Sequence, residues 1–355
     1  MSRAPTLVIR ADASSAVGVG HAMRCLALAQ AWQDAGGAAV FAWAELPAPL
    51  RDRLQRENVR TVRLPGPVGG AADRDALQVL CRREPADWIA VDGYRFSPNY
   101  GAALRHDGAR LLWLDDMMHL ASYPADLLLN QNLGDRTDPY AGKVGRETEL
   151  LLGPRHCLLR REFRDFQDWR RPAAHTPRRL LVSFGGGDAE NFSARILQKL
   201  VRSARTDLEV VVLAGAANPH VPKLRQVAAA VPFPCEIRVN AGNVAEAMAW
   251  ADFAVTAGGS TVWELAALKL PALVCAVEDN QQTCLPLLRT IPFLRPVVID
   301  DILSGDLIGE LDRLLAAPAT DCPIDALGSE RVVRRMLAHL PPDLVGSTAP
   351  GRTAS

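Results

Sequence analysis

Short apolar runs alternate with longer segments of helical periodicity along most of the chain. In the first half this pattern predicts strands at 7–10, 38–43, 59–64, 88–92, 110–115 and 127–129. It restarts in the second half, with strands predicted at 180–184, 208–214, 235–239, 253–256 and 272–276. Helices are predicted between them at 21–35, 47–57, 74–83, 189–201, 243–250 and 262–268, among others. Strands and helices that alternate at this spacing predict α/β units with parallel, doubly wound sheets.

Chain length and local composition indicate two such units. A chain of 355 residues is long for a single hydrophobic core. We expect one Rossmann-like domain over 1–160 and a second over 180–340. The intervening residues 161–179 are rich in arginine, aromatic residues and proline and are predicted to cross between the domains. Residues 341–355 are rich in Pro, Gly, Ser and Thr and are predicted to form a flexible tail.

The composition excludes several classes of protein. Hydrophobic residues make up 48% of the chain and charged residues 23%, as in ordinary globular proteins. Lysine plus arginine equals aspartate plus glutamate, 40 of each, so no overall field attracts nucleic acid or an anionic membrane. No apolar segment approaches the ~20 residues of a transmembrane helix, and the seven cysteines are scattered without a CxxC pair. We therefore expect a cytoplasmic protein with reduced thiols, no nucleic-acid partner and no membrane insertion.

A glycine turn that ends in histidine joins the first predicted strand to the first predicted helix. In Gly18-Val-Gly20-His21, free backbone N–H groups, a helix N-terminus and a titratable ring come together. The alternative is a tight turn whose histidine only caps or packs, because short glycine motifs recur widely. Ligands of doubly wound sheets bind beyond the carboxyl ends of the strands. The polar residues predicted at those ends are Asp12, Asp92, Tyr94, Asp115 and Asn130.

Two more glycine turns occur in the second half, at 185–188 and 258–261. Neither follows a dinucleotide or P-loop pattern. The turn Gly258-Gly259-Ser260-Thr261 is the best phosphate candidate, because it combines exposed N–H groups, two hydroxyls and a helix N-terminus. Glu264 then lies on the first helical turn, where its carboxylate can accept hydrogen bonds from a ribose. The same spacing equally fits a capping box, with Ser260 or Thr261 as the cap and Glu264 at its third position.

Longer motifs resemble one enzyme family. Ile-Arg-Ala-Asp12 followed by Gly18-x-Gly20-His21-x-Met-Arg24-Cys-Leu is similar to the opening signature of the UDP-2,4-diacetamido-2,4,6-trideoxy-β-L-altropyranose hydrolases, the PseG family. The likeness continues, in the same order, through 91–94, 114–116, 128–133, 151–163, 182–188, 257–264 and 280–281. That family resembles the lipid II N-acetylglucosaminyltransferase in fold. The resemblance therefore implies a GT-B-like α/β fold, with two Rossmann-like domains facing each other across a cleft.

The resemblance also implies an activity. Water attacks the anomeric carbon of a UDP-linked diacetamido sugar with inversion, without metal or other cofactor, and UDP and the free sugar are released for pseudaminic acid biosynthesis. The implied partner is this UDP-sugar, and we expect a monomer. Two alternatives remain open on the sequence. The first is an inverting glycosyltransferase of the same fold that uses a UDP-sugar donor. The second is a non-catalytic nucleotide-sugar-binding protein.

Residue roles follow from the matched motifs. His21 matches the catalytic base, a role that suits an imidazole because its ordinary pKa lies near neutrality. Tyr94 matches a tyrosine of the sugar pocket, and Glu264 matches a ribose-binding glutamate. The remaining residues expected to bind substrate are Gly18, Gly20, Arg24, Asp92, Gly186, Gly258, Gly259, Ser260, Thr261, Asn280 and Gln281. We expect Asp12 to orient His21 or the water, or else to hold the turn, and Arg24 to bind phosphate or to pair with Asp12.

Overall fold

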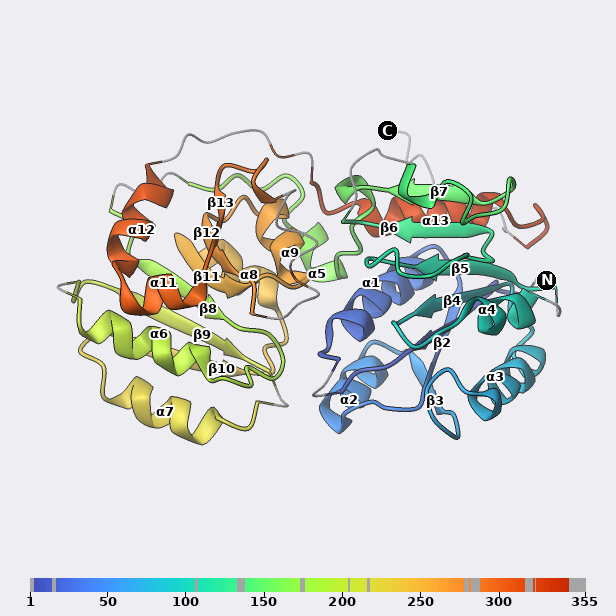
Figure 1. Ribbon diagram of the computed structural model, residues 1–355, viewed down its shortest axis with the longest axis horizontal. Helices are drawn as coiled ribbons and strands as arrows, with labels where there is room; N and C mark the ends of the chain where they lie inside the picture. Colours follow the sequence, from blue (N-terminus) through green and yellow to red (C-terminus); the bar gives the residue numbers. More distant parts are fainter. Residues whose placement is uncertain are drawn as a thin grey trace, which may run out of the picture. The chain divides into compact units, whose positions relative to one another are not determined.

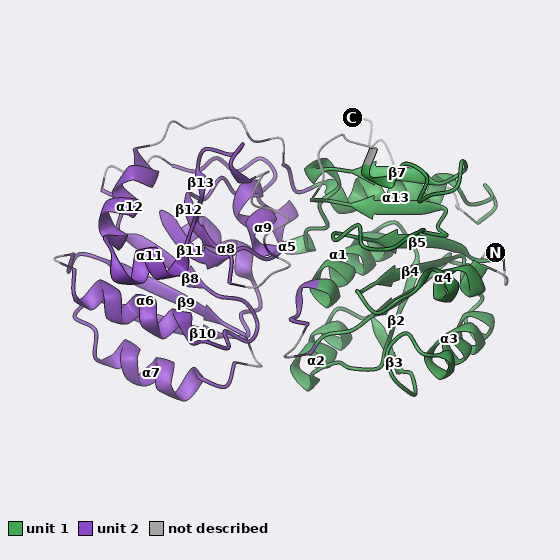
Figure 2. Cartoon of the chain, in the orientation of Figure 1, with its two compact units in different colours: residues 1–13, 21–161, 327–355 green, residues 14–20, 162–326 purple. Residues whose placement is uncertain are grey.

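A computed structural model of the chain divides it into two compact units (Figure 2). Unit 1 comprises residues 1–13, 21–161 and 327–355, and unit 2 comprises residues 14–20 and 162–326. The structure describes residues 3–14, 17–105, 108–132, 138–172, 176–203, 205–215, 218–277, 281, 288–316, 322 and 324–344. We describe each unit by itself.

Unit 1 is built on a seven-stranded parallel sheet with strand order β3-β2-β1-β4-β5-β6-β7. The strands are β1 (Thr6–Ala11), β2 (Ala38–Trp43), β3 (Arg60–Arg63), β4 (Trp88–Asp92), β5 (Arg110–Leu114), β6 (Leu127–Asn130) and β7 (Glu149–Leu152). The helices are α1 (Gly20–Asp34), α2 (Ala48–Arg56), α3 (Ala71–Arg83), α4 (Pro98–Leu104) and α13 (Gly328–Ala338), with 3₁₀ turns η2 (Asp138–Tyr140) and η3 (Pro154–His156) (Figure 1). The central strands are continuous apolar runs because helices cover both faces of a parallel sheet.

Unit 2 repeats this plan with a six-stranded parallel sheet of order β10-β9-β8-β11-β12-β13. The strands are β8 (Arg179–Ser183), β9 (Glu209–Ala214), β10 (Cys235–Val239), β11 (Phe253–Ala257), β12 (Ala272–Cys275) and β13 (Leu294–Val297). The helices are α6 (Phe192–Val201), α7 (Val221–Ala229), α8 (Val244–Trp250), α9 (Thr261–Ala267), α11 (Ile299–Ser304) and α12 (Leu307–Leu315). The short helix α5 (Arg161–Arg164) lies where the chain passes from unit 1 to unit 2.

The predicted strands are present, but among the described residues the sequence pattern missed strands β7 and β13 and helices α5, α7, α11, α12 and α13. Strands β2, β4 and β10 have the predicted limits. The missed strands, β7 and β13, are the outermost strands of their sheets. Each has only one or two buried residues, and β13 contains Pro296, which an edge strand tolerates. The other two edge strands, β3 and β10, have no buried residue and were nevertheless predicted, so an edge position alone does not explain the two misses.

The last helix, α13, lies in a different unit from the one that the sequence predicted. We expected 180–340 to form one domain, whereas α13 belongs to unit 1 (Figure 2). The indole N–H of Trp88 in β4 donates to the carbonyl of Met336 (3.1 Å), and the hydroxyl of Ser329 donates to the carbonyl of Leu159 (2.9 Å). Val332, Val333 and Met336 are buried on the inner face of the helix. Helical periodicity predicts that such a face is covered, but not by which sheet.

Side chains at the C-terminal end of α13 contact Glu149 in β7, the edge strand of the sheet. Glu149 in β7 accepts from Arg335 Nε (2.7 Å) and lies 3.0 Å from His339 Nε2. The hydrogen bond from Arg335 is the main cause that lowers the pKa of the Glu149 carboxyl below its ordinary value. A carboxyl with a lowered pKa in the folded state stabilises the fold above its unfolded pKa and loses this contribution as the pH falls through the folded pKa.

We predict that Glu149→Gln lowers the melting temperature at pH 7, because the ionised partner of Arg335 is lost. The difference between variant and wild type should shrink below about pH 4.5, the ordinary pKa of the carboxyl, because the wild-type side chain then becomes neutral as well. Thermal unfolding measured between pH 7 and pH 3 tests this. Glu147→Gln, at an exposed position two residues earlier, is the matched control. A difference that grows towards low pH would contradict the assignment.

Candidate active site

The turn after β1 and the end of β4 bring His21 and Asp92 together. Strand β4 pairs directly with β1, with Asp92 opposite Ala11, so the first turn of α1 lies beside the carboxyl end of β4. His21 Nδ1 lies 2.6 Å from Asp92 Oδ1. Both side chains are buried, Asp92 completely and His21 at 6% exposure. The histidine is thus held by a carboxylate that water does not reach.

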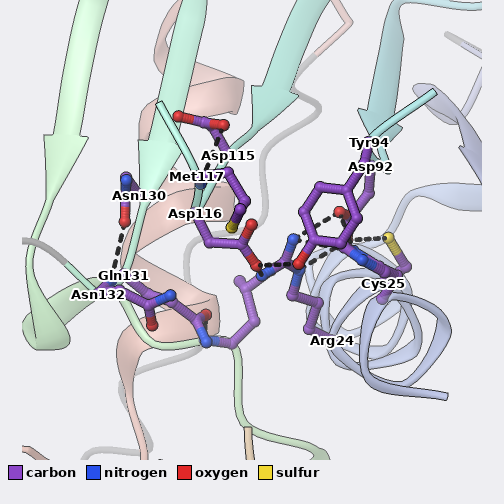
Figure 3. Close-up of polar contacts among 12 residues, drawn as sticks. Arg24, Cys25, Asp92, Tyr94, Asp115, Asp116, Met117, Asn130, Gln131 and Asn132 are labelled. Atoms are coloured by element: carbon purple, nitrogen blue, oxygen red, sulfur yellow. Dashed lines mark hydrogen bonds and ion pairs between the residues drawn. The ribbon is translucent and has the colours of Figure 1, made fainter. Parts of the chain in front are cut away.

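Arg24 lies one helical turn beyond His21 and completes the cluster (Figure 3). It donates to both oxygens of Asp92, from Nε at 2.7 Å and from Nη2 at 2.6 Å, in the two-pronged geometry that favours arginine. Its third nitrogen, Nη1, donates to Asp116 Oδ2 at 3.0 Å. The thiol of Cys25 also donates to Asp92 Oδ2, at 3.4 Å. Asp92 therefore binds protein groups, and the sequence-based expectation that it binds substrate directly does not fit this geometry.

The charge state of Asp92 determines which nitrogen of His21 is available. Burial raises the pKa of the Asp92 carboxyl, but the charges of Arg24 and His21 and their hydrogen bonds outweigh burial and hold that pKa well below its ordinary range. An ionised carboxylate only accepts hydrogen bonds, so His21 Nδ1 carries the proton. In a neutral imidazole the other ring nitrogen, Nε2, then carries the lone pair. This assignment gives His21 the tautomer of a general base.

Tyr94 follows β4 and lies against the histidine. Gly93 precedes it with φ of 147°, a value that side-chain-bearing residues rarely adopt, and a Cβ there would lie 3.1 Å from the ring of Phe96. The Tyr94 ring packs edge-on against His21, with centroids 4.7 Å apart. Its hydroxyl donates to Asp116 Oδ2 at 3.2 Å (Figure 3). The sequence analysis did not single out Asp116, which holds Tyr94 and Arg24 at once; its position after β5 was the available signal.

Asp12 does not contact His21, and the expectation that it orients the histidine is wrong. Its Oδ2 accepts from Arg10 Nη1 at 2.6 Å, and its Oδ1 accepts from the backbone N–H groups of Ala44 and Glu45 at 2.7 and 2.8 Å. Arg10 is fully buried and also donates to both oxygens of Asp73, at 2.9 and 2.7 Å. Asp12 therefore holds the loop after β2 to the end of β1. Arg24, which we expected might pair with Asp12, pairs with Asp92 and Asp116 instead.

In unit 2, Gln281 shapes the glycine turn after β11. Its side-chain oxygen accepts from the backbone N–H groups of Gly258 (3.1 Å) and Val277 (3.0 Å). Gly259 is half-buried, with no heavy atom within 4 Å of the position that a Cβ would take. Ser260 makes no side-chain hydrogen bond at the start of α9, so it does not act as the cap of a capping box. Glu264 is half-buried on the first turn of this helix.

The other predicted site residues lie on backbone turns or outside the described residues. Gly18 has φ of 77°, and its N–H donates to the carbonyl of Ser14 at 2.9 Å. Gly20 begins α1. Gly186 is half-buried in the turn after β8, where a Cβ on the neighbouring Gly215 would collide with its backbone. Asn280 lies outside the described residues.

Within the described ranges, no three His, Cys, Asp or Glu side chains are grouped so that they could hold a metal ion. In the same ranges, no helix has the length and apolar character needed to cross a bilayer.

Several solved structures are similar to this chain in fold. MurG of Acinetobacter baumannii is 15% identical, with 95% of this chain and 100% of that chain covered and a TM-score of 0.60. The UDP-GlcNAc 2-epimerase of Neisseria meningitidis bound to UDP-GlcNAc is 10% identical, with coverage of 95% and 100% and a TM-score of 0.62. MnaA of S. aureus with UDP is 14% identical, with coverage of 96% and 98% and a TM-score of 0.62. At these identities the likeness concerns the fold, and it confirms a two-domain α/β fold of the GT-B class.

Among characterised sequences, the chain is similar to the UDP-2,4-diacetamido-2,4,6-trideoxy-β-L-altropyranose hydrolase of Campylobacter jejuni. The two are 24% identical over 281 residues, which cover 78% of this chain and 94% of the hydrolase. An uncharacterised protein of Methanocaldococcus jannaschii, MJ1062, is 21% identical over 284 residues, 78% of this chain but only 57% of that protein's length. No protein-family model matches the sequence. The similarity to the hydrolase supports the family relationship that the motifs suggest.

We predict that Asp12→Asn lowers the free energy of unfolding by about 1–3 kcal/mol, because buried Arg10 loses part of its charge compensation. Urea denaturation measures the change. Asp75→Asn, which removes an exposed carboxylate on α3, is the control and should alter stability by no more than ~0.5 kcal/mol. Equal stabilities of the Asp12 variant and the wild type would contradict the structural role of Asp12.

Proposed function

We propose that this protein hydrolyses a UDP-linked diacetamido sugar, releasing UDP and the free sugar. The observation that carries the proposal is the contact of His21 with Asp92, whose carboxylate also binds Arg24; His21 and Arg24 both belong to the opening motif that resembles the hydrolase family. The similarity to the Campylobacter hydrolase supports the substrate class. The fold supports a nucleotide-sugar enzyme more generally.

In the proposed mechanism, His21 Nε2 removes a proton from water while the water oxygen attacks the anomeric carbon. The bond between that carbon and the UDP oxygen breaks, UDP leaves with the electron pair, and the configuration inverts. Asp92 stabilises the imidazolium that forms, and Arg24 keeps Asp92 ionised throughout. The proton then passes from His21 to solvent. Each of these roles requires only contacts found within unit 1.

The diphosphate is assigned to the turn Gly258–Thr261, whose N–H groups would stabilise the charge that develops on UDP. Glu264 is assigned to the ribose hydroxyls and Tyr94 to the sugar. Gln281 takes a different role from the one expected, because its side-chain oxygen is used to fix Gly258 and Val277. Asn280, Gly18, Gly20 and Gly186 keep the substrate-binding roles that the resemblance implies. The same resemblance implies catalysis without metal or cofactor in pseudaminic acid biosynthesis. The scattered cysteines favour a cytoplasmic location, and we expect a monomer.

The principal alternative is a glycosyltransferase, since the GT-B fold also serves that chemistry. The two reactions differ in what attacks the anomeric carbon. A transferase needs a hydroxyl acceptor, whereas a hydrolase uses water. An assay without acceptor therefore separates them.

We predict that the purified protein releases UDP from UDP-2,4-diacetamido-2,4,6-trideoxy-β-L-altropyranose without an acceptor and with a chelator present. In ¹⁸O-labelled water, the label should enter the sugar, because water attacks carbon. Mass spectrometry of both products and NMR of the initial anomer measure this. A strict requirement for a metal or an acceptor, or label in UDP, would overturn the proposal.

We predict that His21→Ala lowers kcat by about 100- to 10,000-fold, as expected for a lost general base, with little change in UDP affinity. Asp92→Asn should also lower kcat by at least ~100-fold, because an amide no longer fixes the tautomer of His21. Asp75→Asn is the matched control and should keep wild-type kcat. Steady-state kinetics and calorimetry with UDP test the set. An unchanged kcat in His21→Ala would return His21 to a structural role.

A further inference from the structure

The segment after β5 lies beside the proposed catalytic residues and has an unusual backbone. In Asp115-Asp116-Met117-Met118-His119, Met118 has φ of 53°, a left-handed conformation that a long side chain rarely adopts. Strain of this kind persists only where the surroundings enforce it, and it is common at ligand sites. The contacts of this segment show what enforces the conformation.

Buried Asp115 is the internal support of the segment. Its carboxylate accepts from the N–H groups of Met117 (3.4 Å) and Met118 (3.1 Å), and from the hydroxyl of buried Tyr140 (2.5 Å). From the connection between β6 and β7, Lys143 Nζ donates to the carbonyl of Met118 at 2.9 Å. The strained residue is thus fixed at both its N–H and its carbonyl.

The side chains on either side of Met118 are both partly exposed. Met117 is 38% exposed and is one of few exposed large apolar side chains in the described ranges. Figure 3 shows it beside Asp116, whose carboxylate accepts from Tyr94. The ring of His119 packs edge-on against Tyr94, with centroids 6.1 Å apart, on a side chain that is 35% exposed. Tyr94 itself packs on His21. His21, Tyr94 and His119 therefore form a row of packed rings. The exposed thioether of Met117 lies two residues before His119 in the same segment.

We infer that Met117 and His119 recognise an acetamido group of the sugar. The inference rests on the proposed function and assigns residues that the family motifs do not. A thioether packs against a methyl group, and an imidazole can hydrogen-bond either the N–H or the carbonyl of an amide. An acetamido group presents a methyl and an amide together, whereas a hydroxyl or a free amine lacks the methyl. Met117 and His119 are specificity residues in this assignment, and Asp115 positions them.

The test compares three UDP-sugars: the 2,4-diacetamido sugar and its two analogues in which one acetamido group is replaced by a free amine. Discrimination is the ratio of kcat/KM for the diacetamido sugar to that for each analogue. In Met117→Ala and His119→Ala, discrimination against one of the two analogues should fall about 10-fold, through a higher KM for the diacetamido sugar with kcat kept within about twofold. Met117→Leu and His119→Gln should restore most of it. Val79→Ala, an exposed apolar residue on α3, is the control.

Two outcomes overturn the inference: discrimination that stays unchanged in both alanine variants, or kcat/KM that falls by the same factor for all three sugars. Failure of the proposed function is a separate result, in which wild-type protein releases no UDP from any of the three. The sugars then stay intact, and calorimetric dissociation constants replace kcat/KM in the same ratios. A 10-fold loss of discrimination in those ratios supports recognition by Met117 and His119 even without hydrolysis.

Discussion

The two-pronged ion pair between Arg24 and Asp92 is the interaction on which the candidate site depends. Both groups are buried, and a buried charge is tolerated only when an opposite charge and hydrogen bonds compensate it. Arg24 is compensated by Asp92 and Asp116, just as Arg10 on the same sheet edge is compensated by Asp12 and Asp73. The guanidinium of Arg24 thus binds both the carboxylate that contacts His21 and the carboxylate that accepts from the Tyr94 hydroxyl. Histidine, tyrosine and their supports are therefore held as one rigid group.

The sequence predicted much of the fold because central parallel strands are unmistakable apolar runs. It also predicted that His21, Asp92 and Tyr94 would gather at one sheet edge, since all follow strands of the same sheet. It could not choose the partner of His21. Asp12 is nearer in the chain, but Asp92 is nearer in space because β4 pairs with β1. Strand order depends on pairing between strands that are distant in sequence, and the local pattern of apolar and polar residues does not reveal it.

The residues missed by sequence reasoning share one property: their meaning depends on contacts distant in sequence. Asp116 matters because Arg24 and Tyr94 both donate to it from other elements. Met117 and His119 take the proposed role only because Asp115 and Lys143 hold Met118 in a left-handed conformation that a methionine rarely adopts. The state of Cys25 also depends on a residue distant in sequence. Burial is the main cause that raises the pKa of its thiol, and the charge of Asp92 is the second, so the thiol stays neutral and unreactive.

The return of α13 to the first sheet makes residues 162–326, the larger part of unit 2, an insertion within unit 1. During synthesis on the ribosome, residues 162–326 emerge in full before the helix that covers Trp88 and docks on Glu149. Residues 162–326 can therefore fold on the nascent chain before α13 is available to cover the sheet of unit 1. The histidine, its carboxylate and Tyr94 belong to the unit that matures last. The unit to which we assign UDP binding is thus synthesised in full before the unit to which we assign catalysis.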